Sequence, residues 1–213
     1  VIHRRQRQMC IRDRKKSIPW PNIGTMTGEI PMKRKYGLRD MSYLDTLEAK
    51  PIFETQANII IKNDYKGIVD VGCRHGPIND FLYEKNYKDY QYYGFDTSPE
   101  PIEYARKRWG NKFRYEVNDW ANLKGVEFDV DCIIFSGVLL YEKDHYKMFT
   151  DIMNFYNCKN AIIQEPYHEQ TYYEEKLKLK SITNDMQQYN FKYQTIVEAE
   201  IFCGRRLIAE AKL

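Results

Sequence analysis

The 213-residue sequence lacks several features that would place it in common protein classes. No apolar run approaches the ~20 residues needed to cross a bilayer, so we predict no membrane-spanning helix and no membrane partner. The five cysteines are odd in number and scattered, and they form no C-x-x-C pair, which indicates reduced thiols in a cytoplasmic protein. No His, Cys and carboxylate residues have the spacing of a metal site, so we expect no metal.

The chain has no excess of basic charge outside the N-terminus. Residues 1–16 carry a net charge of +6 whereas the whole chain carries +3, which leaves −3 for residues 17–213. A body without basic excess is poorly suited to a phosphate backbone, so we do not expect a nucleic acid partner. The segment Gln6–Arg14 resembles translated adaptor sequence, and we expect residues 1–16 to be a disordered or artefactual tail. A basic arm that binds nucleic acid is the alternative.

A glycine-containing turn between a predicted strand and a predicted helix is the most informative feature present. Ile68 to Val71 is a short apolar run typical of a buried strand, and Gly72 and Gly76 bracket the turn that follows. Such a turn brings backbone N–H groups and a helix N-terminus close to a ligand. Asp70 stands at the end of the strand, where open α/β sheets bind their ligands.

Two further predicted strands end in acidic residues. The run 90–96 ends at Asp96 and is followed by Thr97-Ser98-Pro99, a helix-start signal. The run 112–117 is closely followed by Asp119. A carboxylate in the position of Asp96 can accept charge-assisted hydrogen bonds from both hydroxyls of a ribose. Three acidic strand ends suit a ligand with a cationic centre, a ribose and an adenine amino group, and no phosphates.

The glycine spacing argues against a nicotinamide cofactor, although Asp96 alone would suit one. A dinucleotide-binding turn has the pattern G-x-G-x-x-G, whereas this turn reads Gly-x-x-x-Gly with Arg74 at the central glycine position. A nicotinamide-dependent oxidoreductase is therefore the weakest alternative.

From about Glu54 to Leu213 the chain resembles the class I S-adenosylmethionine-dependent methyltransferases, a Rossmann-like superfamily. The motifs that carry the resemblance are residues 69–76 (VDVGCRHG), 94–106 (GFDTSPEPIEYAR), 118–119 (ND) and 133–141 (IIFSGVLLY). The resemblance implies the cofactor S-adenosyl-L-methionine. It assigns cofactor binding to Asp70, Gly72, Cys73, Arg74, Gly76, Asp96, Thr97, Asp119, Trp120, Ser136 and Gly137.

Within this set, the resemblance gives particular residues particular roles. Asp96 would accept hydrogen bonds from the ribose hydroxyls, and Asp119 would accept one from the adenine amino group, with Trp120 beside the ring. The two turn glycines would let the backbone approach the methionine part. Arg74 departs from the family, which often has glycine there, so its side chain must point away from the ligand or reach the ligand's carboxylate.

The alternation of apolar strands and helical segments predicts an α/β fold. We expect a doubly wound, mostly parallel seven-stranded sheet with helices on both faces and a C-terminal antiparallel hairpin formed by runs 193–202 and 206–213. Residues 54–213 would form the S-adenosylmethionine-binding methyltransferase domain, and residues 17–53 an N-terminal arm or a lid over the cofactor. Helices are expected at residues 54–63, 99–109, 144–156 and 169–189.

The resemblance implies methyl transfer to an oxygen or nitrogen atom of an acceptor. The fourth strand lacks the Asn/Asp-Pro-Pro-aromatic signature of enzymes that methylate exocyclic amines of bases, and no Pro-Cys follows it, so a small-molecule acceptor is favoured by elimination. A non-catalytic S-adenosylmethionine-binding module or subunit and a nucleic-acid methyltransferase are the alternatives. The acceptor and the oligomeric state cannot be read from the sequence.

Candidate general bases lie on the loops that follow the fourth and fifth predicted strands. Tyr141, His145 and His168 are the catalytic candidates. The two histidines have an unperturbed pKa of ~6.5, which suits a general base. His145 falls in the first turn of a predicted helix, where a surface position is the alternative. The wider set of candidates on these loops also includes Glu142, Asp144, Glu165 and Tyr167.

Overall fold

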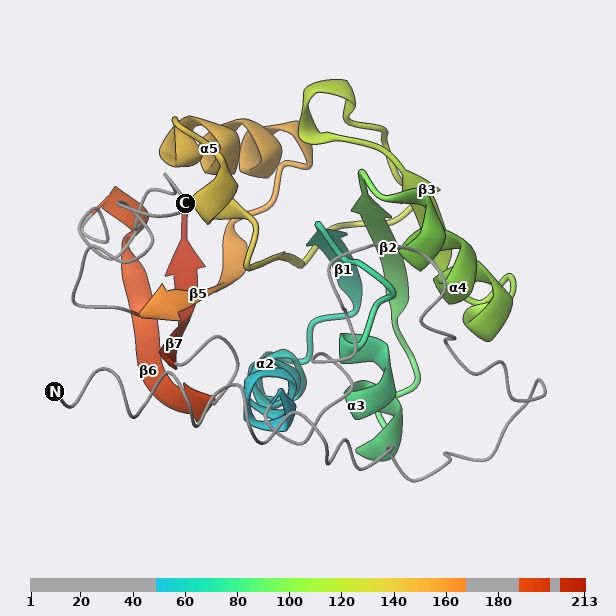
Figure 1. The fold of residues 1–213 in the computed structure, drawn as a ribbon, viewed down its shortest axis with the longest axis horizontal. Helices are drawn as coiled ribbons and strands as arrows, with labels where there is room; N and C mark the ends of the chain where they lie inside the picture. The colour runs from blue at the N-terminus through green and yellow to red at the C-terminus, as the bar shows by residue number, and fades with distance from the viewer. Residues whose placement is uncertain (1–48, 168–187, 200–203) are drawn as a thin grey trace, which may run out of the picture.

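The structure is a computed structural model that describes residues 49–167, 188–199 and 204–213 (Figure 1). The predicted tail, most of the predicted arm and nearly all of the helix expected at 169–189 lie outside the described residues, and so does His168.

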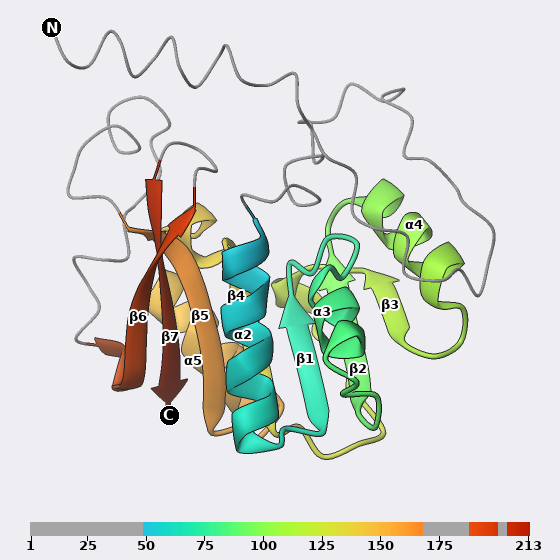
Figure 2. The ribbon, with the colours of Figure 1, turned by 90° about the horizontal axis from the view of Figure 1, so that it is seen from below.

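A single seven-stranded sheet forms the centre of the described chain, with the strand order β3-β2-β1-β4-β5-β7-β6. The first five strands pair in parallel, whereas β7 pairs antiparallel with both β5 and β6. Figure 2 shows β1 pointing toward the upper edge of the sheet and β7 pointing the opposite way. The predicted α/β sheet with a C-terminal hairpin is confirmed. The strands are β1 (Gly67–Val71), β2 (Gln91–Asp96), β3 (Arg114–Val117), β4 (Cys132–Ser136), β5 (Asn160–Tyr167), β6 (Phe191–Ala199) and β7 (Gly204–Lys212).

Helices cover both faces of the sheet, as predicted. Figure 2 shows α2 and α3 in front of the strands and α5 behind them. The side chains of one strand alternate between the faces, so Ile68 packs in the core shared with α2, α3 and α4, while its neighbour Val69 packs in the core shared with α5. The helices are α2 (Lys50–Asn63), α3 (Ile78–Glu84), α4 (Pro99–Trp109) and α5 (His145–Phe155), with short 3₁₀ helices η2 (Trp120–Asn122) and η3 (Leu139–Tyr141).

The helix limits follow from local chemistry. Helix α4 has the predicted bounds because Pro99 suits a first turn and Gly110, with φ of 57°, follows its last residue. Helix α2 begins at Lys50 rather than at the predicted Glu54. Pro51 falls in its first turn. A backbone N–H there would have no intrahelical acceptor, so the lack of an N–H in proline costs no hydrogen bond. Asp144 accepts a hydrogen bond from the backbone N–H of Lys147, so it caps α5.

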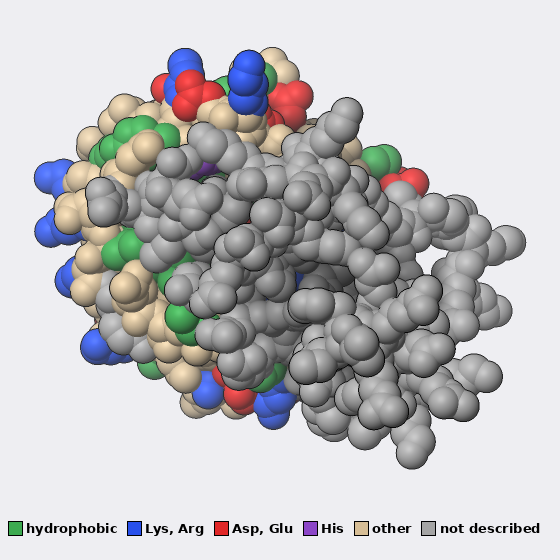
Figure 3. Space-filling model, turned by 60° about the vertical axis from the view of Figure 1, so that its left-hand side comes forward, with side chains coloured by type: hydrophobic (Ala, Val, Ile, Leu, Met, Phe, Trp, Pro, Cys, Tyr) green, Lys and Arg blue, Asp and Glu red, His purple; other side chains and the backbone are tan. Residues whose placement is uncertain are grey.

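The surface of the described chain carries charges of both signs. Acidic and basic side chains lie next to one another at the upper edge of the view in Figure 3. Among the described residues, no helix is long and apolar enough to span a membrane.

Candidate functional site

The carboxyl ends of β1, β2 and β3 meet at one edge of the sheet and bring the predicted acidic residues together. Asp70 lies beside Gly94 of β2, and Asp96 lies beside Val117 of β3. Pairing continues beyond the strands, because the backbone N–H of Cys73 donates to the carbonyl of Phe95 at 3.0 Å and that of Asn118 to the carbonyl of Asp96 at 3.0 Å. The glycine turn and the segment that carries Asp119 are therefore fixed to the same edge as Asp96.

Asp96 is held in place by main-chain donors. Its Oδ1 accepts a hydrogen bond from the backbone N–H of Ser98 at 2.8 Å, and its Oδ2 accepts one from the backbone N–H of Arg74 at 3.1 Å. A carboxylate has about four lone-pair positions, so these bonds orient the group and leave acceptor capacity. The observed geometry fits a carboxylate that receives a pair of hydroxyl groups.

Asp70 is buried and only half satisfied. Its Oδ2 accepts a hydrogen bond from the Tyr92 hydroxyl at 2.7 Å, while its Oδ1 meets no donor among the described residues. Burial raises the pKa of Asp70 to about 7; the Tyr92 hydrogen bond opposes that rise, and the nearby charge of Asp96 adds to it. A buried carboxyl oxygen without a donor is costly to maintain, which makes it a candidate for binding a cationic group.

The turn glycines are required by packing within the protein. Gly72 and Gly76 have φ of +68° and +69°, which only glycine adopts readily. A Cβ on Gly72 would lie 3.1 Å from Val138 Cγ2, and one on Gly76 would lie 2.3 Å from the Tyr115 hydroxyl. The predicted approach of these residues to a cofactor stays a prediction, and the structure adds this second reason for their small size.

Cys73 turns its side chain into the core. It is buried, and a Cβ on Gly94 would lie 2.7 Å from its sulfur, so the thiol fills the space above that glycine. Burial raises the pKa of the thiol, which keeps it protonated. The sulfur of Cys73 is therefore a packing group, and its backbone N–H and carbonyl are bonded to Phe95 and Gly76.

Arg74 turns its side chain toward Asp96. Its Nε lies 4.0 Å from Asp96 Oδ2, and the side chain is 33% exposed. The sequence left open whether this side chain points away from the site; the structure places its Nε near the carboxylate of Asp96.

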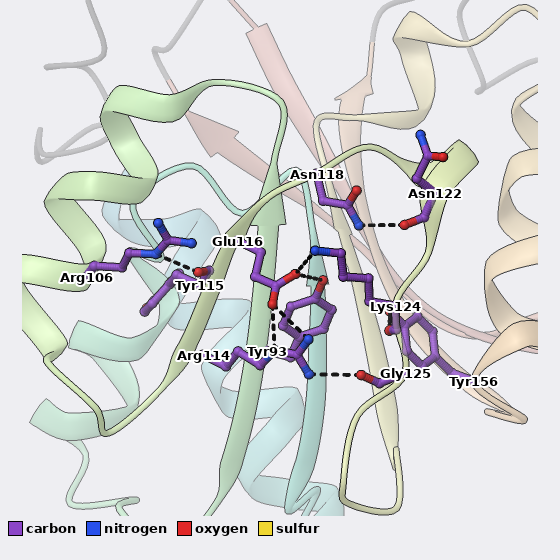
Figure 4. Close-up of polar contacts among 10 residues, drawn as sticks. All are labelled: Tyr93, Arg106, Arg114, Tyr115, Glu116, Asn118, Asn122, Lys124, Gly125 and Tyr156. Atoms are coloured by element: carbon purple, nitrogen blue, oxygen red, sulfur yellow. Dashed lines mark hydrogen bonds and ion pairs between the residues drawn. The ribbon is translucent and has the colours of Figure 1, made fainter.

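The segment after β3 is ordered by side-chain amides. Asn122 donates to Asp119 Oδ1 at 2.9 Å, and Asn118 donates to the main-chain oxygen of Asn122 at 2.8 Å. Figure 4 shows that last contact beside the cluster in which Glu116 meets Arg114 and Lys124. Asp119 and Trp120 are half-buried here, and Thr97, after β2, is exposed.

Ser136 and Gly137 lie at the end of β4, within a small polar cluster. The Ser136 hydroxyl accepts a hydrogen bond from Gln56 Nε2 at 3.0 Å and donates one to Gln164 Oε1 at 3.0 Å. Gly137 has φ of +68° and donates its N–H to the carbonyl of Gln164 at 2.7 Å. Sequence reasoning did not identify either glutamine, since a glutamine in a helix or a strand carries no distinctive signal.

The catalytic candidates have different environments. Tyr141 is 53% exposed at the end of η3. His145 is buried; its Nδ1 is hydrogen-bonded to the Tyr189 hydroxyl, and the two rings stack at a centroid distance of 5.9 Å. The surface position that the sequence left open for His145 is therefore wrong, because α5 turns this residue toward Tyr189.

Glu165 is a fully buried acid beside the same edge. Its Oε1 accepts hydrogen bonds from the backbone N–H groups of Val138 and Leu139 at 3.0 and 2.8 Å, which holds the chain between β4 and η3. Burial raises its pKa to about 8, while the Leu139 N–H and the charge of Arg206 act in the opposite direction. The sequence placed Glu165 only in the wider set of loop candidates, because nothing local signals that it is buried.

Within the described ranges there is no group of three or more His, Cys, Asp or Glu residues that could hold a metal ion. The polar groups that converge on the edge are carboxylates, backbone amides and one guanidinium, a set that suits an organic ligand with a diol and charged groups.

Comparisons with known proteins point to methyltransferases. Residues 68–157 match a family described as "Methyltransferase domain". A curated release factor glutamine methyltransferase from Dictyoglomus turgidum is 35% identical over 98 residues, which are 46% of this chain and 29% of that protein. The chain thus spans just under a third of the length of this relative.

Solved structures with the same fold are more distant in sequence. Magnesium protoporphyrin IX methyltransferase from Synechocystis PCC 6803, with bound SAH, has a TM-score of 0.61 at 14% identity, covering 87% of this chain and 89% of that one. The N-methyltransferase NodS from Bradyrhizobium japonicum WM9 has a TM-score of 0.56 at 15% identity, covering 76% of this chain and 95% of that one. These matches confirm the predicted fold.

Proposed function

We propose, from the premise that this chain belongs to the class I S-adenosylmethionine-dependent methyltransferases, that it transfers a methyl group to an oxygen or nitrogen atom of a small-molecule acceptor. A member of this family would have a glycine turn after β1 and acidic residues at the ends of β1 and β2. The acceptor, and the roles of individual residues toward donor and acceptor, are part of the proposal.

The single observation that carries the proposal is the joint placement of Asp70 and Asp96. Asp96 is oriented by two main-chain N–H groups and retains acceptor capacity for a ribose diol. Asp70 offers a buried oxygen without a donor among the described residues, which suits the ammonium group of the donor's amino-acid part. Asp119 and Trp120, which follow β3, would take the adenine.

S-adenosylmethionine supplies a methyl group already activated by a sulfonium centre, so the protein's main task is positioning. Proximity and orientation alone give effective molarities on the order of 10⁵ M or more. The rigid turn at Gly72–Gly76 and the carboxylate of Asp96 would hold the donor. The main chain from Gly137 to Leu139, pinned by Glu165, would border the space for the acceptor.

A general base is needed only if the acceptor keeps its proton until the transition state. Tyr141 remains a candidate because it is exposed near the end of β4. His145 would need a change in packing to reach an acceptor, because it is buried beside Tyr189. His168 remains a candidate from the sequence alone.

The small-molecule acceptor is supported by what the sequence lacks at the end of β4, which reads Ser136-Gly137-Val138-Leu139. The relative from Dictyoglomus turgidum is named for a glutamine of a release factor, and the neighbour from Synechocystis for a porphyrin. A protein acceptor is therefore the second candidate.

Isothermal titration calorimetry with S-adenosylmethionine and S-adenosylhomocysteine tests donor binding; no heat at millimolar concentrations would refute the proposal. Incubation with labelled donor and a metabolite extract, followed by mass spectrometry, then asks which species gains one methylene mass. Label that enters only the protein fraction of a lysate would favour the second candidate. Binding without turnover on any pool would indicate a non-catalytic subunit.

A further inference from the structure

Gln56 is a polar residue on the buried side of its helix. The other buried residues of α2 are all apolar, and Gln56 lies among them with 1% of its surface exposed. Its Oε1 has no hydrogen-bond donor among the described residues. A buried amide oxygen without a donor is costly, so a glutamine at this position is unfavourable for stability alone. The unpaired oxygen therefore indicates a role other than packing.

A hydroxyl group connects Gln56 to a second glutamine, on β5. Nε2 of Gln56 donates a hydrogen bond to Oγ of Ser136 at 3.0 Å, and Oγ of Ser136 donates one to Oε1 of Gln164 at 3.0 Å. Gln164 is also buried, and no described residue accepts a hydrogen bond from its Nε2. This chain of three side chains therefore ends in an unused acceptor, Oε1 of Gln56, and an unused donor, Nε2 of Gln164.

The three side chains lie beside the proposed donor site. Asp70 and Asp96 belong to the ends of β1 and β2, whereas Ser136 is the last residue of β4 and Gln164 pairs with it on β5. Strand β4 lies next to β1 in the sheet, so both groups of side chains belong to the edge formed by the carboxyl ends of the parallel strands. Ser136 and Gly137 are half-buried, so part of this cluster faces solvent. An acceptor that lies here would be next to the donor.

The unused acceptor and donor match a neutral planar group that has an N–H and a carbonyl side by side. Neither glutamine has a charge with which to pair an ammonium or a carboxylate. A carboxamide or a lactam supplies the N–H that Oε1 of Gln56 lacks and the carbonyl oxygen that Nε2 of Gln164 lacks. If both amides are turned over, the two glutamines exchange these roles, and the matching group is the same.

We propose that Gln56 and Gln164 are specificity-determining residues that select an acceptor with a carboxamide or lactam group. The proposal rests on the proposed function, because it names the chemical class of the acceptor in the same reaction. The bound group lies between α2, β4 and β5, and its N–H pairs the oxygen that is unpaired in the ligand-free protein. An acceptor without the N–H leaves that oxygen unpaired, which is the physical basis of the selection.

The test compares two rings of nearly the same shape. These are γ-butyrolactam and γ-butyrolactone, in which a ring oxygen replaces the N–H. Each is titrated into the nitrogen-isotope-labelled full chain, with and without S-adenosylhomocysteine, and NMR follows the side-chain NH₂ signals of Gln56 and Gln164. The lactam should shift both signals and bind about 10-fold or more tightly than the lactone, because one hydrogen bond is missing for the lactone. The signal of Gln91, exposed at the opposite end of the strands, should not move.

Variants separate recognition from a structural role. Gln56→Leu keeps a side chain of similar size and suits the apolar side of α2, so it should fold. Both Gln56→Leu and Gln164→Leu should bring the two dissociation constants close to each other, whereas Gln91→Leu should leave their ratio unchanged. If one leucine variant does not fold, the other variant and the wild-type signals still decide.

Two kinds of result would overturn the inference: equal affinities of the wild type for the two rings, or a preference for the lactam that persists in the leucine variants. Wild-type NH₂ signals that do not respond to the lactam would do the same. Failure of the proposed function is seen separately, because wild-type protein would then give no heat with S-adenosylhomocysteine in calorimetry.

Discussion

The hydroxyl of Tyr92 donates a hydrogen bond to Asp70 Oδ2 at 2.7 Å and thereby fixes a buried carboxyl group at the end of β1. This is the one donor that the described structure gives Asp70, whose pKa is raised to about 7, mainly by burial. The same burial that prepares the group for a cationic ligand makes it unfavourable for the stability of the ligand-free protein.

Asp70→Asn should therefore stabilise the ligand-free protein, and more so at alkaline pH. Because the folded pKa is above the ordinary 3.8, the folded state binds more protons between about pH 4 and pH 7, and wild-type stability falls as pH rises through that window. Asp70→Asn does not lose stability as pH rises in this way, because asparagine does not ionise. Urea unfolding at about pH 5 and pH 8 should show a larger gain at the higher pH. The control is Asp151→Asn, which removes the exposed ion pair of Asp151 with Lys147 on α5. Its stability should change little at either pH.

Asp96→Ala should weaken the binding of S-adenosylhomocysteine about 10-fold or more, the effect of losing a charge-assisted hydrogen bond of ~1.5 kcal/mol. 5′-Methylthioadenosine should lose affinity by a similar factor because both ligands carry the ribose. Calorimetry measures both. Equal affinities in wild type and variant would show that the ribose binds elsewhere.

Gly76→Ala and Gly110→Ala form a matched pair. Both glycines have positive φ, a region that alanine disfavours, so each substitution loses stability from the backbone alone. A methyl group on Gly110 would have no neighbour within 4 Å, whereas one on Gly76 would lie 2.3 Å from the Tyr115 hydroxyl. Gly76→Ala should thus lose about a further 1–3 kcal/mol in urea unfolding. Equal losses at both sites would show that Tyr115 moves aside easily.

Glu165 should be tolerated as glutamine but not as alanine. Glu165→Gln keeps an oxygen for the N–H groups of Val138 and Leu139, while Glu165→Ala leaves them without this acceptor, at about 1–3 kcal/mol each. The folded pKa of about 8 makes wild-type stability fall as pH rises from about 4.5 to 8, and Glu165→Gln should remove that contribution while leaving the one from Asp70 below about pH 7. Thermal melts across that range measure both effects; a pH slope as steep in the glutamine variant as in wild type would show that Glu165 does not contribute to it.

Local patterns predicted most of the fold. The bounds of α4 followed from Pro99 and Gly110, and the hairpin of β6 and β7 from two β runs around Gly204. The acidic strand ends at Asp70 and Asp96 were recognisable because parallel strands place their carboxyl ends at one edge. All of these depend on residues close together in sequence.

The burial and the hydrogen-bond partners of the candidate site residues could not be predicted from the sequence. The sequence left His145 between a surface and a catalytic position, yet it lies buried against Tyr189, a residue distant along the chain. In the sequence, nothing distinguishes Glu165 from other acidic residues on loops. Only the structure shows that the N–H groups of Val138 and Leu139 donate to its side chain. The direction of the Arg74 side chain depends on the turn conformation and on Asp96, which belongs to another strand.

By itself, the sequence determined the order of strands and helices, the glycine turn and the identity of the acids at the strand ends, because backbone preferences and apolar periodicity act over a few residues. Only the tertiary structure decided which of those acids are buried, which donors they meet and where the guanidinium lies. Desolvation and hydrogen bonding depend on groups that neighbouring strands bring within a few ångströms, and no single segment of the chain contains that information.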